Sequence, residues 1–61
     1  MATYHMWKDI SGDFYWTLKS DENGRIITKS SESYESKQGA ENSIAWTRNN
    51  AAGASYEDHT K

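Results

Sequence analysis

The sequence predicts an α+β fold, in which a β-β-β-α-β unit forms an antiparallel sheet with one helix on one face. Three observations support this class. The first half of the chain alternates large and polar side chains in three short runs, a pattern typical of strands. From Lys37 to about Asn50 the apolar spacing is that of a single helix, and Ala54–Asp58 is long enough for one last strand. We treat residues 1–61 as one domain.

The three predicted strands of the first half cover about residues 3–8, 14–20 and 25–30. Between the first two, the run Asp9–Asp13 contains residues that favour turns. The second strand presents two different faces, because successive side chains of a strand point in opposite directions. One face carries Phe14, Trp16 and Leu18, and the other carries Tyr15, Thr17 and Lys19.

The second and third strands are predicted to form a hairpin. A three-residue loop at 22–24, with its glycine in the left-handed conformation, places Ser20 opposite Ile26 and puts Ile26 on the core face. A two-residue loop would instead place Lys29 opposite Leu18 in the core. We therefore prefer the three-residue loop.

The predicted helix begins after Ser36, a residue type that favours the N-cap position. Gly53 is available for a left-handed cap at its end. The apolar stripe of this helix consists of small residues spaced for one face: Ala40, Ser43, Ile44, Thr47 and Ala51. These residues let the helix approach the sheet closely, but they cover little apolar area.

The short length of the chain predicts that it pairs. A chain of about 60 residues buries only about 60% of the surface of its unfolded form, so small domains use disulfides, metals or oligomerisation. The sequence has no cysteine, and its histidines, His5 and His59, lie at opposite ends. We therefore expect no metal or other cofactor, and we expect a homodimer.

Two residues are the candidate dimer contacts. Tyr56 is the centre of the last strand, which is too short to stand alone and which two copies can exchange at low cost. Trp46 lies about 120° from the centre of the helix stripe, at 3.6 residues per turn. It is placed either to touch the helix of a second copy or to overhang the edge of its own sheet, and the sequence favours neither.

The face of the sheet opposite the helix is a candidate interaction surface. We interpret this partly aromatic surface as a contact site for an unknown protein, because exposed apolar patches mark such sites. An alternative is single-stranded nucleic acid stacked on the rings, which the net charge of −2 and the two lysines of this face disfavour. The candidate residues are His5, Trp7, Tyr15, Lys19, Ile27 and Lys29.

The sequence gives no indication of catalysis. It contains no catalytic elbow or zinc-helix motif, and its acidic turns lack the spacing of a calcium loop. We expect a non-catalytic protein, the remaining alternative being a ligand carrier or enzyme whose site lies at the dimer seam. No apolar run has the length of a membrane helix and no signal peptide is apparent, so we expect a cytoplasmic protein without membrane contact.

Six runs of the sequence form a recognisable series. They are WKD (7–9), FYWTLKS (14–20), NGRIITKS (23–30), YESK (34–37), SIAWTRNNA (43–51) and YED (56–58). By their order and spacing, more than by any one run, they resemble the YegP-like family of small bacterial and archaeal proteins over nearly the whole chain. The resemblance implies β-β-β-α-β units that pair by exchanging the last strand, with the helices together on one sheet face. It implies no established activity, cofactor or catalytic residue.

Overall fold

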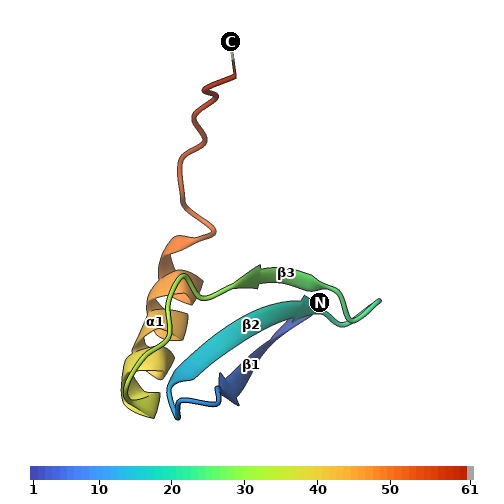
Figure 1. Ribbon diagram of the computed structural model, residues 1–61. Helices are drawn as coiled ribbons and strands as arrows, with labels where there is room; N and C mark the ends of the chain where they lie inside the picture. Colours follow the sequence, from blue (N-terminus) through green and yellow to red (C-terminus); the bar gives the residue numbers. More distant parts are fainter. Residues whose placement is uncertain (61) are drawn as a thin grey trace.

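The computed structural model describes residues 1–60 of the 61-residue chain. Three antiparallel strands lie in the order β1-β2-β3, and α1 packs against the central strand β2 (Figure 1). The predicted α+β class, with three strands followed by one helix, is confirmed. The elements are β1 Ala2–Lys8, β2 Phe14–Ser20, β3 Ile26–Lys29 and α1 Lys37–Asn50.

The turn between β1 and β2 is organised by the side chain of Asp9. Its Oδ1 accepts hydrogen bonds from the backbone N–H groups of Ser11 (2.9 Å) and Asp13 (3.0 Å). Gly12 adopts a φ of 86°, which a residue without a Cβ reaches at little cost. This turn sets a register in which Trp7 lies opposite Tyr15, so both rings share one face of the sheet.

The loop between β2 and β3 is longer than predicted. The N–H of Gly24 donates to the carbonyl of Ser20 (2.8 Å), and the N–H of Ser20 donates to the carbonyl of Arg25 (2.9 Å), which encloses the four residues 21–24. Local side chains stabilise this longer loop, since Asn23 Oδ1 accepts from the N–H of Arg25 (2.9 Å). The predicted three-residue loop is therefore wrong, although Gly24 is left-handed as expected, with a φ of 70°.

A bulge in β3 compensates for the extra loop residue. Ile26 pairs with Lys19 and not with Ser20, and the register then shifts by one residue. Leu18 and Thr28 consequently lie opposite each other, as predicted. Because Ile26 pairs with Lys19, it lies on the face away from the helix, and its predicted place on the core face is wrong.

The ends of α1 differ in how well the sequence predicts them. Ser36 is the N-cap, and its Oγ accepts from the N–H of Gly39 at 3.0 Å. At the other end Ala51 caps the helix in the right-handed conformation, and its N–H donates to the carbonyl of Thr47 (2.8 Å). The expected left-handed cap at Gly53 is not formed, because that residue does not have a positive φ.

The segment between β3 and α1 returns along β2 before the helix begins. Phe14 and Tyr34 exchange two backbone hydrogen bonds, each 2.7 Å long. Further along β2, the N–H of Ser30 donates to the carbonyl of Trp16 (2.9 Å), and Ser30 Oγ accepts from the N–H of Trp16 (3.2 Å). These bonds position the first turn of α1 over the sheet, where Tyr34 packs close to Gly39.

The core forms where α1 crosses β2. Trp16 is 4% exposed and Ala40 is completely buried. The indole Nε1 of Trp16 donates to Ser43 Oγ at 2.6 Å, and that hydroxyl donates to the carbonyl of Ala40 at 2.9 Å. The ring of Tyr4 meets Trp16 edge-on, with 5.3 Å between the ring centroids. One large side chain is thus held under the small residues of the helix by packing and by a hydrogen bond.

This core is not closed by a single chain. Among the described residues no large side chain is completely buried. The accessible surface is 5073 Å², about 1,000 Å² more than the roughly 4,000 Å² expected for a folded monomer of 7.0 kDa. Part of the excess comes from the C-terminal tail, and part from core residues that remain only half-buried: Tyr4, Met6, Phe14, Leu18 and Ile44.

The tail after α1 extends away from the rest of the chain (Figure 1). Tyr56 is 87% exposed, and within the described chain residues 55–60 form no backbone hydrogen bond to the sheet. The strand predicted at about 54–58 therefore has no ladder in the single chain. Its pairing with a second chain stays a prediction.

Replacing Trp16 by Ala should lower the free energy of unfolding by about 3–5 kcal/mol, because it removes the one large side chain buried beneath α1. Trp16→Phe should retain part of the packing. Ser43→Ala keeps the packing of the ring but removes the acceptor of the indole hydrogen bond and the donor to the carbonyl of Ala40, and it should cost less than Trp16→Ala. Urea unfolding at one fixed protein concentration measures all three. Equal losses for Trp16→Ala and Ser43→Ala would contradict this account of the core.

Candidate functional site

Two surfaces gather the candidate functional residues. The first, which we call the open face, is the sheet face opposite α1, and it comprises His5, Trp7, Tyr15, Thr17, Lys19, Ile26 and Lys29. The second, which we call the edge hollow, is an open depression of about 460 Å³ beside the outer edge of β3. It is lined by Trp16, Thr28, Lys29, Ser31, Tyr34, Ser43, Trp46 and Thr47.

Thr17 lies at the centre of the open face and is only 5% exposed. Its Oγ1 accepts a hydrogen bond of 2.9 Å from the indole Nε1 of Trp7. Sequence reasoning placed Thr17 on this face but did not foresee its burial. The available signal was its position in the middle of the central strand, where His5 and Lys29 lie opposite it on the two neighbouring strands.

Cationic and aromatic side chains interleave on the open face. The Nζ of Lys19 lies 5.3 Å from the ring centroid of Trp7, and the Nζ of Lys29 lies 5.1 Å from that of Tyr15. His5 stacks against Trp7 with a centroid distance of 6.2 Å and an interplanar angle of 29°. Ammonium groups within about 6 Å of a ring centroid are attracted by its quadrupole. The chain thus holds two positive charges against its own rings.

The structure brings together most, but not all, of the residues predicted for this surface. A hollow of about 200 Å³ on the open face is lined by Trp7, Tyr15, Thr17, Lys19, Ile26 and Lys29. Ile27 does not line it: this residue lies at the bulge of β3 and is 58% exposed. Ile26 occupies the position on the open face that the predicted register gave to Ile27.

The open face is positively charged although the chain carries a net charge of −2. Within residues 1–60 no carboxylate lies within 4.0 Å of the Nζ of Lys19 or Lys29. Asp9 and Glu32 line a neighbouring hollow together with Lys29, and both Asp9 and Asp21 accept local hydrogen bonds. Asp21 accepts from Thr3 Oγ1 at 2.7 Å, and Asp9 accepts from the backbone of its own turn. The lysines are therefore available to an external anionic group.

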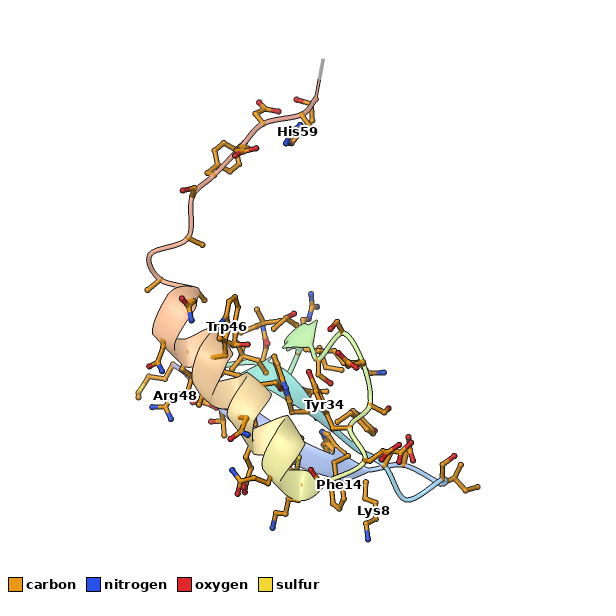
Figure 2. All side chains as sticks on the ribbon, turned by 90° about the vertical axis from the view of Figure 1, so that its left-hand side faces the viewer. Lys8, Phe14, Tyr34, Trp46, Arg48 and His59 are labelled. Atoms are coloured by element: carbon orange, nitrogen blue, oxygen red, sulfur yellow. The ribbon has the colours of Figure 1, made fainter. Side chains whose placement is uncertain are left out.

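In the edge hollow the aromatic side chains come from three different parts of the chain. Trp46 of α1 is 68% exposed, and Tyr34 belongs to the segment that precedes the helix (Figure 2). Trp16 of β2 contributes the buried ring. Trp46 thus overhangs the β3 side of its own sheet, and its contact with a second helix remains a prediction. The outer edge of β3 beside the hollow has no backbone partner among the described residues.

The titratable groups with shifted pKa values lie outside both surfaces. The hydroxyl of Ser20, followed by the N-terminal ammonium group, lowers the pKa of Glu22. The hydroxyl and N–H of Thr60 lower the pKa of Asp58. Within residues 1–60 there is no cluster of three His, Cys, Asp or Glu side chains placed to hold a metal, and no helix long and apolar enough to span a membrane.

Comparison with known proteins identifies the family. Residues 9–58 match the model of a family described as a domain of unknown function, DUF1508. The chain belongs to the DUF1508 family. This assignment confirms the predicted resemblance to YegP-like proteins. The chain is also similar to a protein from Haloferax volcanii whose structure was determined by NMR in solution, with 33% identity, 93% of each chain covered and a TM-score of 0.84. No curated protein matches the chain.

The description of the DUF1508 family gives no activity, so the function must be argued from the surfaces of the molecule. The open face offers two ammonium groups beside a small, partly apolar hollow. The edge hollow offers exposed aromatic rings beside a free strand edge. Both arrangements are suited to contacts with polypeptide chains, which supply backbone groups, apolar side chains and carboxylates together.

Replacing Thr17 by Val should lower the free energy of unfolding by about 0.5–1.5 kcal/mol, because it keeps the side-chain size but removes the acceptor of the Trp7 indole. Thr17→Ser keeps the hydroxyl and should retain the bond. The indole N–H signal of Trp7 in an NMR spectrum should move and exchange faster in the Val variant alone. The signal of Trp46 serves as an internal reference, and an unchanged Trp7 signal would refute the bond.

Proposed function

We propose that this DUF1508 protein is a homodimeric, non-catalytic module that exchanges its C-terminal strand and binds another protein on its open face. The observation that carries the dimer is the incomplete core, in which residues of the helix-facing side remain half-buried while the tail projects from the molecule. The surface in excess of a compact monomer, about 1,000 Å², is similar to the roughly 800 Å² that each partner buries in a standard interface.

The tail of a second copy fits the edge hollow in length and in chemistry. The segment Ala54–Asp58 has five residues, and β3, whose outer edge is free, has four. Paired along that edge, the segment supplies the missing backbone hydrogen bonds. In the register that pairs Tyr56 with Thr28, Tyr56 lies on the side of the sheet that carries Trp46 and Trp16. A tyrosine buries about 150–250 Å² in such a position, which makes it the main apolar contribution of the tail.

Exchange between copies is favoured over pairing within one chain by the direction of the tail. The tail leaves the end of α1 away from its own sheet (Figure 1). Two copies that each donate a tail and each accept one form a closed, two-fold interface, and no free edge is left at β3. The exchanged strand covers the edge of β3, which otherwise offers a template for uncontrolled association.

Dimerisation should weaken when the proposed contacts are truncated. We expect light scattering across a dilution series to show a dimer at micromolar concentration for the wild type. Tyr56→Ala and Trp46→Ala should each raise the dissociation constant at least tenfold, which corresponds to about 1.4 kcal/mol. Arg48→Ala, an exposed change on the same helix, is the control and should have little effect. A monomeric wild type at these concentrations would overturn the proposal.

The exchange itself should be visible in a mixed dimer of isotope-labelled and unlabelled chains. Filtered NMR experiments should detect contacts between the Tyr56 ring of one copy and the Trp46 indole of the other. If these contacts occur only within one chain, the tail folds back on its own sheet. In that case the dimer, if present, is built without strand exchange.

The open face remains available in this arrangement, because the exchanged strand adds to the edge of the sheet and its Tyr56 points to the helix side. Its exposed ring of Trp7 and its two lysines are unusual for a face without a partner. Aromatic residues are enriched at the centres of protein interfaces, whereas they are costly to leave in water. This supports a protein ligand as the occupant of the open face.

A further inference from the structure

We propose that the ligand of the open face is an extended acidic segment of a protein, in which one apolar side chain is flanked by carboxylates two residues before and two residues after it. This inference rests on the proposed role of the open face in binding protein, and it adds the chemistry of the partner. It is carried by three features of the described residues: the unpaired lysines, the size of the hollow that they line, and the groups that lie over the aromatic rings.

Charge complementarity selects an acidic partner. Lys19 and Lys29 are the ammonium groups of the open face, and within residues 1–60 neither is paired with a carboxylate. Their Nζ atoms are held 5.3 Å and 5.1 Å from ring centroids, which limits the freedom that a partner must remove on binding. The rest of the chain is acidic, so the face is a local positive region on a negatively charged molecule.

The size of the hollow selects a side chain rather than a metabolite. Its volume is about 200 Å³, below the roughly 300–1,000 Å³ of pockets that enclose small ligands. Ile26 and the ring of Trp7 provide apolar surface at its wall, and the hydroxyl of Thr17 is already engaged by the Trp7 indole. The apolar part of this lining suits one apolar side chain.

The positions of the two lysines select an extended segment. Lys29 pairs with Thr17 and Lys19 pairs with Ile26, so the lysines come from two neighbouring strands and both border the hollow. In an extended peptide, side chains two residues apart point to the same side. A segment with its apolar residue in the hollow thus presents the carboxylates on either side of it to the face of the sheet on which the two lysines lie.

The covered rings argue against single-stranded nucleic acid. Stacking of bases requires an accessible ring face. On the open face Trp7 is 41% exposed, but His5 stacks against its ring and the ammonium of Lys19 lies over it. The ammonium of Lys29 lies over Tyr15 in the same way, so a stacking base would have to displace these groups. In addition, the net negative charge repels a polyanion, whereas a short acidic segment needs only the two local charges.

The probe is a blocked heptapeptide with a central leucine, a glutamate two residues before it and another two residues after it, and glycine and serine elsewhere. Titrated into the full-length wild type at low salt, it should shift the indole signal of Trp7 and leave that of Trp46 unchanged. Lys19→Gln and Lys29→Gln should each weaken binding about two- to fivefold, as expected for a partly exposed ion pair. The same peptide with glutamines in place of the glutamates should bind at least fivefold more weakly.

Lys8→Gln is the matched control, because Lys8 also holds its Nζ over a ring, 5.2 Å from the centroid of Phe14, but on the helix side of the sheet. It should leave peptide affinity unchanged. Equal weakening by Lys8→Gln, or no shift at Trp7 with millimolar peptide, would overturn the inference. So would an oligothymidine that shifts the Trp7 signal at lower concentration than the peptide, since the ligand would then be nucleic acid.

Light scattering on the same samples separates this inference from the proposed dimer. Peptide binding by a monomer would refute the dimer and leave the acidic ligand standing. A confirmed dimer that ignores the peptide would refute the acidic ligand alone. Lys19 lines the open-face hollow and not the edge hollow. If Lys19→Gln instead raises the dimer dissociation constant tenfold, the open face is occupied by the second copy, and the inference is wrong.

Discussion

The placement of Trp16 on the central strand is the constraint on which the rest of the structure depends. Its ring lies under α1, and its indole N–H is satisfied by Ser43. A buried indole without a partner would cost free energy, so the helix must present a hydroxyl at this position. Ser43 and Ala40 meet that requirement because they are small enough to let the helix approach. The small side chains that accommodate Trp16 consequently cover too little area to bury the whole helix-facing side of the sheet.

The small area that α1 covers links the fold to the proposed pairing. The rings and aliphatic groups beside Trp16 stay half-buried, and the described residues contain no second helix that covers them. The C-terminal tail carries an exposed aromatic side chain, Tyr56, but it extends away from its own sheet. The small residues that fit α1 to Trp16 leave part of the sheet uncovered, and this favours completion of the core by a second copy.

The sequence was sufficient to predict what depends on local pattern, and insufficient where the outcome depends on competition between nearby groups. Alternation along the strands and the spacing of the helix stripe predicted the elements, and Ser36 predicted the N-cap. The hairpin loop was predicted one residue too short, because Asn23 Oδ1 and Ser20 Oγ accept hydrogen bonds from backbone N–H groups of the longer form. The resulting bulge puts Ile26, and not Ile27, in the hollow of the open face.

Burial of Thr17 could not be inferred from its residue type, since threonine is common on exposed strand faces. It follows from the long side chains of the neighbouring strands, which converge above it and leave it 5% exposed. Two consecutive residues of β2 thus form an indole-to-hydroxyl hydrogen bond on opposite faces of the sheet. On the helix side the indole of Trp16 donates to the hydroxyl of Ser43, and on the open face the hydroxyl of Thr17 accepts from the indole of Trp7. Because β2 fixes both contacts, a ligand that orders Trp7 should also restrain the strand that supports the core, which couples the open face to the stability of the helix side.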